Sequence, residues 1–98
     1  MRQPYRVRFE QQVRDFVMSL GPVQRSAIKA ALKQLGDERG DIKVLGGEMA
    51  GWYRLRVGYV RVIFDYRPGR EIRCIFAHHR TMVYELFERE TIARLKRE

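Results

Sequence analysis

The segment Trp52–Tyr66, with the sequence WYRLRVGYVRVIFDY, constrains the fold of this chain more than any other stretch. Apolar residues alternate with other side chains on both sides of Gly58-Tyr59, which is typical of two antiparallel strands joined by a two-residue turn. Such a turn sets Arg56 opposite Arg61, and successive side chains point to opposite faces. One face of the predicted hairpin is therefore apolar and consists of Tyr53, Leu55, Val57, Val60, Val62 and Phe64.

The other face of the hairpin carries three arginines, Arg54, Arg56 and Arg61. Directly opposed like charges destabilise a strand pair by up to ~1 kcal/mol, so these arginines have a small cost for the fold. They are either surface cations that extend into water or a site for a polyanion, because a guanidinium group binds phosphate through two parallel hydrogen bonds. The formal net charge of +8 also favours an anionic partner, which can be nucleic acid, an acidic protein or a membrane.

The N-terminal half predicts a strand and a helical hairpin. Residues 5–9 alternate strictly between apolar and charged, as in a short strand. Two amphipathic helical stripes follow, the first ending at Gly21 and the second at Gly36. We expect residues 37–50 to be a glycine-bearing connection with three apolar anchors, Ile42, Val44 and Leu45.

A third strand and a C-terminal helix complete the predicted fold. The third strand carries Ile72, Cys74 and Phe76 on one side, and we expect this set to face the core. A helical pattern begins at Thr81. The fold class is therefore α+β, with one domain over residues 1–98. The N-terminal strand and helical hairpin pack on a mostly antiparallel four-stranded sheet.

The reactive side chains argue against a cofactor. Cys74 is the only cysteine, so no internal disulfide bond can form and a thiolate zinc site is not expected. His78 and His79 are adjacent, and on a strand they point to opposite sides, which is poor geometry for a metal. The sequence has no apolar run that could span a bilayer and no apolar signal core at its N-terminus, so we expect a cytoplasmic protein with no membrane partner.

Two stretches in the C-terminal half resemble the RelE/ParE superfamily, the toxins of type II toxin–antitoxin modules. They are VLGGEMAGWYRLRVGYVRVIF and AHHRTMVYELF, and the similarity is strongest over Leu45 to Tyr84. Two departures stand out. Ala77 and His78 precede the His79-Arg80 pair where the family often has a glycine, and Val60 directly precedes Arg61 where many members have an aromatic residue.

The resemblance implies a metal-independent endoribonuclease. RelE-like toxins occupy the ribosomal A site and cleave mRNA there by attack of the 2′-hydroxyl on the adjacent phosphate. The implied catalytic residues are Arg61, Arg80 and Tyr84, and the implied RNA-binding residues are Arg54, Arg56 and His79. Arginines are poor bases, so Tyr84 is the natural candidate for the general base. His79 is a candidate proton carrier, since an unperturbed imidazole titrates near physiological pH.

The resemblance also implies partners. These are a cognate acidic antitoxin, the ribosome with its mRNA, and operator DNA only through the antitoxin. Two other functions stay open at this point. ParE-like relatives inhibit DNA gyrase, although they lack the basic catalytic set that this chain has. A non-catalytic RNA-binding module could instead use the basic face, with Trp52 and Tyr59 as stacking groups.

Overall fold

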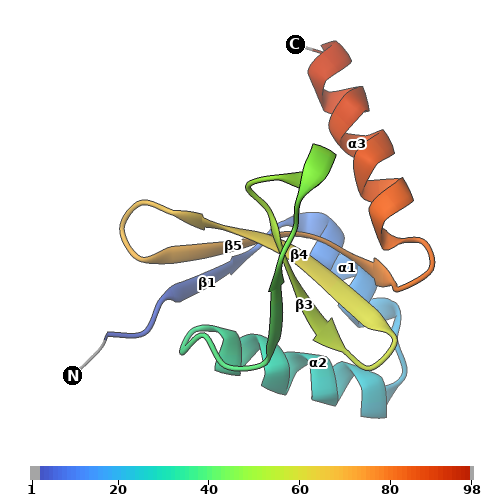
Figure 1. Ribbon diagram of the computed structural model, residues 1–98. Coiled ribbons are helices and arrows are strands. Elements are labelled where there is room, and N and C mark those ends of the chain that lie inside the picture. The colour runs from blue at the N-terminus through green and yellow to red at the C-terminus, as the bar shows by residue number, and fades with distance from the viewer. Residues whose placement is uncertain (1–2, 98) are drawn as a thin grey trace.

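The computed structural model describes the backbone of residues 3–97 and the side chains of residues 3–91. The chain forms a five-stranded sheet in the order β1-β5-β4-β3-β2 together with three α-helices (Figure 1). The elements in chain order are β1 (Arg6–Phe9), α1 (Gln11–Ser19), α2 (Pro22–Leu35), β2 (Asp41–Val44), the short 3₁₀ helix η1 (Gly47–Met49), β3 (Tyr53–Val57), β4 (Val60–Arg67), β5 (Glu71–His79) and α3 (Val83–Arg97).

The sheet is mostly antiparallel. Only β1 runs parallel to its neighbour, β5, and the other three pairings are antiparallel. The predicted α+β class and element order are confirmed, but the strand count is wrong by one. Residues Asp41–Val44, which were expected to lie in a connection, form β2 along the outer side of β3. A four-residue edge strand has too little alternation to be distinguished from a loop, and its pairing with β3 is a long-range feature.

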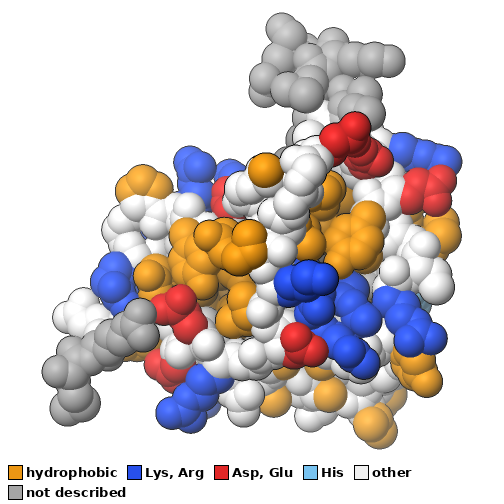
Figure 2. Space-filling model, in the orientation of Figure 1, with side chains coloured by type: hydrophobic (Ala, Val, Ile, Leu, Met, Phe, Trp, Pro, Cys, Tyr) orange, Lys and Arg blue, Asp and Glu red, His pale blue; other side chains and the backbone are white. Residues whose placement is uncertain are grey.

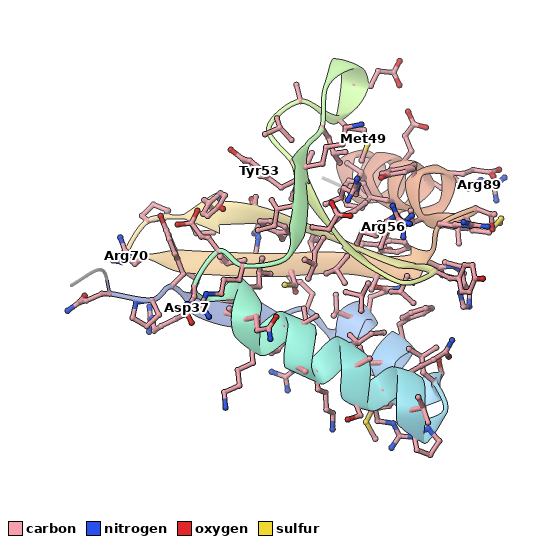
Figure 3. All side chains as sticks on the ribbon, turned by 60° about the horizontal axis from the view of Figure 1, so that its bottom comes forward. Asp37, Met49, Tyr53, Arg56, Arg70 and Arg89 are labelled. Carbon is pink, nitrogen blue, oxygen red and sulfur yellow. The ribbon has the colours of Figure 1, made fainter. Side chains whose placement is uncertain are left out.

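The central hairpin has the predicted register. Arg56 pairs with Arg61 and Val57 with Val60, around a turn at Gly58-Tyr59. Its apolar face packs under α1 and α2, which lie on one side of the sheet, while α3 lies on the other (Figure 3). The core on the helical-hairpin side consists of buried residues from α1, α2, β3, β4 and β5 and from the joint between the two helices. They are Val13, Val17, Leu20, Ile28, Leu32, Leu35, Leu55, Val60, Val62, Phe64, Ile72, Cys74 and Ala77.

A β-bulge in β5 changes which side chains face this core. Phe64 pairs with Cys74 and Ile63 with Phe76, so Ile75 is an extra residue in the ladder. A bulge of this kind shifts the alternation of every residue beyond it by one position. The expectation that Ile72 and Cys74 face the helical hairpin is confirmed, but for Phe76 it is wrong, because Phe76 packs on the α3 side.

The second core is smaller and lies beneath α3. Val83 and Phe87 pack on Ile63, Ile75 and Phe76, and the Phe87 ring meets Trp52 edge-on at 5.3 Å between centroids. The helix covers only one end of this side of the sheet and extends beyond it (Figure 1). In the part of the chain that the structure describes, the rest of this face is not covered by a helix.

A side chain replaces a missing strand at the end of β5. β1 stops at Phe9, which pairs with Cys74, so the backbone of β5 beyond this point has no strand on that side. Gln12 of α1 donates to the Ala77 carbonyl oxygen (2.7 Å) and accepts from the Ala77 N–H (2.8 Å). These two bonds are those that a neighbouring strand would make, and they fix α1 against the end of β5.

None of the helices that the structure describes is both long enough and apolar enough to cross a membrane.

Candidate functional site

A row of polar side chains crosses four strands on the side of the sheet that faces away from α1 and α2. The ladder pairs Asp41 of β2 with Arg56 of β3, Arg56 with Arg61 of β4, and Arg61 with His78 of β5. Directly paired residues share a face, so all four lie on the same side of the sheet. Figure 2 shows basic side chains gathered over this part of the molecule, below α3, with an acidic side chain among them.

Asp41 forms ion pairs with two of the arginines at the β2 edge of this row. Arg54 donates from one terminal nitrogen to the Asp41 backbone carbonyl (3.2 Å) and to its Oδ1 (3.3 Å). A terminal nitrogen of Arg56 lies 4.0 Å from Asp41 Oδ2. The Arg54 side chain is only 15% exposed, whereas that of Arg56 is 53% exposed. Arg56 is therefore the more accessible of the two to a ligand.

Arg61 lies near the centre of the positive charge. Its terminal nitrogen donates to the carbonyl oxygens of Gly58 (2.8 Å) and Val60 (3.1 Å), which hold it against the β3–β4 turn. Burial lowers the pKa of the Arg61 guanidinium, the nearby cations of Arg56 and Arg54 lower it further, and Arg80 adds to the effect. A guanidinium stays protonated in spite of such a shift, so the site keeps its full charge.

Arg80 and Tyr84 complete the cluster from the far end of β5. The Arg80 N–H donates to the Tyr59 carbonyl (2.7 Å), and its guanidinium carbon lies 4.9 Å from the Tyr59 ring centroid. Tyr84 lies in the first turn of α3 and is 37% exposed, close enough to Arg61 to act on its pKa. Five expected residues thus meet on one face: Arg54, Arg56, Arg61, Arg80 and Tyr84.

The two histidines are placed differently from the other expected residues. His79 pairs with Val60, a core residue on the helical-hairpin side, whereas the rings of both histidines lie near Phe16 of α1, at 5.4 Å for His79 and 5.2 Å for His78. The structure therefore does not bring His79 into the arginine row. His78 occupies that row instead, because the bulge at Ile75 shifts the alternation.

His78 has an environment unlike that of a surface histidine. Burial lowers the pKa of its imidazole, and the neighbouring His79 lowers it further. Its Nδ1 is buried and has no hydrogen-bond partner in the described part of the chain. The lowered pKa favours the neutral imidazole near pH 7, and the ring packs near Phe16 and Phe76.

The chemistry of the site is that of an anion-binding surface that also carries the Tyr84 hydroxyl. Among residues 3–91, no group of three or more His, Cys, Asp or Glu side chains is arranged to hold a metal ion. Cys74 is fully buried in the core, and burial raises the pKa of its thiol to about 12, so it is a packing residue as expected. Arginines can bind phosphate and stabilise developing negative charge, and Tyr84 offers an oxygen for proton transfer.

Known structures with a similar fold include RelE proteins from toxin–antitoxin complexes. The RelBE2 complex of Mycobacterium tuberculosis matches with a TM-score of 0.68 and 26% identity, over 82% of this chain and 95% of that one. The archaeal RelE–RelB complex of Pyrococcus horikoshii matches with a TM-score of 0.65 and 26% identity, over 79% and 96% of the two chains. The RelB–RelE complex of Methanococcus jannaschii gives a TM-score of 0.62 at 24% identity, over 82% and 98%.

The chain has a RelE-like fold. Neither the protein-family models nor the curated protein sequences give a match to it. The resemblance in the two sequence stretches and the similarity of fold therefore agree with each other.

Asp41 and His78 are the two residues of the polar row that the sequence did not predict. Asp41 lies in the segment that was expected to be a connection, and the alternation of DIKV over residues 41–44 is the only local signal for it. His78 takes its place through the bulge, for which the local sequence has no glycine or other marker.

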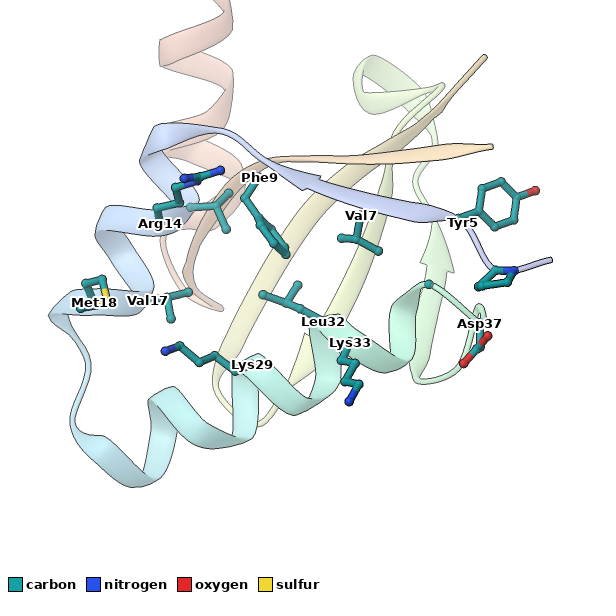
Figure 4. A pocket seen from close by; sticks show the side chains of 13 residues that line it. Tyr5, Val7, Phe9, Arg14, Val17, Met18, Lys29, Leu32, Lys33 and Asp37 are labelled. Atoms are coloured by element: carbon teal, nitrogen blue, oxygen red, sulfur yellow. The ribbon is translucent and has the colours of Figure 1, made fainter. Parts of the chain in front are cut away.

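A second surface feature of this RelE-like chain lies on the helical-hairpin side. An open groove of about 730 Å³ runs between β1, α1 and α2 (Figure 4). Its walls are mainly apolar and include Val7, Phe9 and Val17, while Lys29 and Lys33 also line it. The groove and the arginine row are separated by the sheet.

Proposed function

We propose that this chain is the toxin of a type II toxin–antitoxin module and that it is a ribosome-dependent endoribonuclease. The observation that carries the proposal is the convergence of four arginines and Tyr84 on one open sheet face. The fold similarity to RelE proteins from toxin–antitoxin complexes supports the toxin role. Such a toxin acts in the cytoplasm, where the ribosomes are.

The proposed reaction is scission of the RNA backbone by the 2′-hydroxyl of the preceding ribose. The 2′-oxygen loses its proton and attacks phosphorus. The bond from phosphorus to the 5′-oxygen then breaks, which leaves a 2′,3′-cyclic phosphate, and the 5′-oxygen gains a proton from water. Arg61 and Arg80 stabilise the additional negative charge of the phosphorane, a role in which one lost donor typically costs about 10²–10³-fold in rate. Tyr84 accepts the proton from the 2′-hydroxyl, and Arg54 and Arg56 hold the flanking phosphates.

The need for a ribosome follows from the openness of the face. Arg56 is half-exposed and the arginine row lies outside the groove described above, so the chain has little with which to hold a flexible RNA in line for attack. Positioning of reactants can supply a large part of a rate enhancement. We propose that the A site positions the mRNA and that this chain supplies the charges.

Purified chain and ribosomes programmed with a defined mRNA test this proposal. Mapping of the mRNA 5′ ends should show cuts within the A-site codon, in frame, and no cuts in the same mRNA without ribosomes. The Arg61→Ala variant is the matched control and should cut the message about 10²–10³-fold more slowly. Salt-sensitive binding without scission would favour the RNA-binding module. Uncut mRNA together with DNA damage in expressing cells would favour gyrase inhibition.

A cognate antitoxin is the partner that we propose for the helical-hairpin side. The net charge of +8 favours an acidic protein, and the apolar groove with Lys29 and Lys33 suits an amphipathic acidic segment. An antitoxin segment bound in the groove would not cover the arginine row. Inhibition would then require a second part of the antitoxin to cover that row, or displacement of the helix that bears Tyr84.

Co-expression with the neighbouring open reading frame tests the partner. Its product should restore growth and co-purify with the chain. The double variant Lys29→Glu, Lys33→Glu should weaken the complex, whereas Arg67→Glu, an exposed change outside the groove, should leave it intact. A product that rescues growth but binds the double variant as tightly as wild type would place the antitoxin elsewhere.

A further inference from the structure

We propose that Tyr59 positions Arg80 for the reaction, a role that rests on the proposed nuclease function. Tyr59 lies at the tip of the hairpin and is 63% exposed, although it is a large aromatic residue. Burial therefore does not account for its presence at this place. The contacts of Tyr59 with Arg80 account for it instead.

The turn itself is built to present this side chain. Gly58 has φ of +58°, a conformation that favours glycine at the first of the two turn positions. Tyr59 takes the second position, with its side chain outside the strand pair. Since the register around the turn is tight, with Val57 opposite Val60, the ring has a defined place relative to the end of β5.

The same turn holds the two arginines on which the proposed reaction depends most. Arg61 donates to the carbonyls of Gly58 and Val60, and the Arg80 N–H donates to the carbonyl of Tyr59. The Arg80 guanidinium carbon then lies 4.9 Å from the centre of the Tyr59 ring, within the range of a cation–π contact.

The contact with the Tyr59 ring restrains the Arg80 side chain. Arg80 follows β5, precedes α3 and is exposed. Within the described residues its guanidinium makes no hydrogen bond and no ion pair, and the face of Tyr59 is its aromatic contact. A long side chain without such a restraint samples many rotamers, so loss of the ring should move positive charge away from Arg61 for much of the time.

The sequence at this turn departs from the superfamily pattern described above. Where many superfamily members have an aromatic residue directly before the arginine, this chain has Val60, which is buried in the core. The aromatic residue stands one place earlier, at the turn, where it can reach Arg80. In this register the aromatic residue at the turn, Tyr59, contacts Arg80, which is another residue of the candidate site.

A double-mutant cycle on programmed ribosomes tests the role. At saturating protein, Tyr59→Leu should slow single-turnover cleavage by about 10- to 100-fold with little change in ribosome binding. Tyr59→Phe keeps the ring face and should restore most of the rate. In an Arg80→Ala background, Tyr59→Leu should add no further loss, because the group on which the ring acts is absent.

Nuclear magnetic resonance of the arginine side chains gives a readout that does not depend on cleavage. The Arg80 Nε–H should be ordered in the wild type and in Tyr59→Phe, and mobile in Tyr59→Leu, while all three proteins melt at similar temperatures. If the wild type fails to cut ribosome-bound mRNA, the proposed function fails, and the Arg80 signal still decides the contact. An Arg80 side chain that is equally ordered in Tyr59→Leu overturns the positioning role. So does a Tyr59→Leu effect that persists without Arg80, because the ring would then contact the RNA itself.

Discussion

The two faces of the sheet are built on opposite principles. On the helical-hairpin side, α1 and α2 cover the strands, and thirteen buried residues form one apolar core. On the other side, α3 covers one end over a cluster of five buried residues, and arginines occupy the remainder. Neighbouring residues of a single strand, such as Arg61 and Val62, therefore belong to different environments.

One face of the sheet therefore stabilises the fold, and the other carries a charged site that lowers its stability. The core side supplies the burial that stabilises the fold, at roughly 25 cal/mol per Å² of apolar surface. The open side keeps like charges close together, which costs stability at each opposed pair. Substitutions on the core side should therefore change the stability, and substitutions on the open side should change the activity.

The largest expected effect concerns two side chains of α3. Tyr84→Phe should reduce cleavage on the ribosome by roughly 10²–10⁴-fold, the usual loss for a general acid–base group, without weakening binding. Phe87, which is buried beneath the same helix, should behave in the opposite way. Phe87→Leu should lower the melting temperature and keep cleavage near wild type at temperatures below the melt.

Single-turnover cleavage and a binding assay at one salt concentration separate these results. A wild-type rate in the Tyr84→Phe variant would eliminate the tyrosine as the base and direct attention to His78. Loss of binding together with cleavage would mean that the tyrosine packs against the RNA.

The adjacent pair Arg61 and Val62 compares the two faces within one strand. Arg61→Ala should lower the cleavage rate by about 10²–10³-fold and leave the melting temperature unchanged, because the side chain points away from the core. Val62→Ala should cost about 2 kcal/mol of unfolding free energy, because Val62 is fully buried. Urea denaturation and cleavage of both variants check the pair. An Arg61→Ala protein that unfolds as easily as Val62→Ala would contradict the assignment of faces.

The bond between Gln12 and Ala77 is a smaller and purely structural test of the core side. Gln12→Ala leaves the N–H and the carbonyl of Ala77 without partners, at an expected cost of about 1–3 kcal/mol. Gln11→Ala is the matched control, since it removes only an exposed bond to Asp15 and should cost little. Equal unfolding free energies for the two variants would show that α1 does not replace a strand.

The smallest expected effect is a pH dependence from His78. Its pKa is lower in the folded chain than the ordinary value of 6.5, so the unfolded chain binds the proton more readily. The contribution of His78 to stability should therefore be fully present above about pH 6.5 and decrease as the pH falls below it. Denaturation at several pH values should show this slope in the wild type and a weaker slope in His78→Gln. An unchanged slope would assign the effect to another group.

Much of this organisation could be predicted from the sequence, because it depends on local periodicity. The alternation from Trp52 to Tyr66 determines the hairpin, its register and the face on which Arg54, Arg56 and Arg61 lie. The helical hairpin follows in the same way from the apolar spacing that ends at Gly21 and Gly36. Burial makes these features predictable, since a one-residue slip would move a whole apolar set into water.

Three features were decided only by the tertiary structure. Pairing with β3 turns residues 41–44 into a strand and brings Asp41 beside Arg54 and Arg56. Packing under α3 favours Ile75 and Phe76 on the same side of β5, and the resulting bulge moves His78, in place of His79, into the arginine row. The contact of Arg80 with Tyr59 joins the end of one strand to the start of another. Each of these depends on contacts between residues far apart in the chain, which a local pattern does not contain.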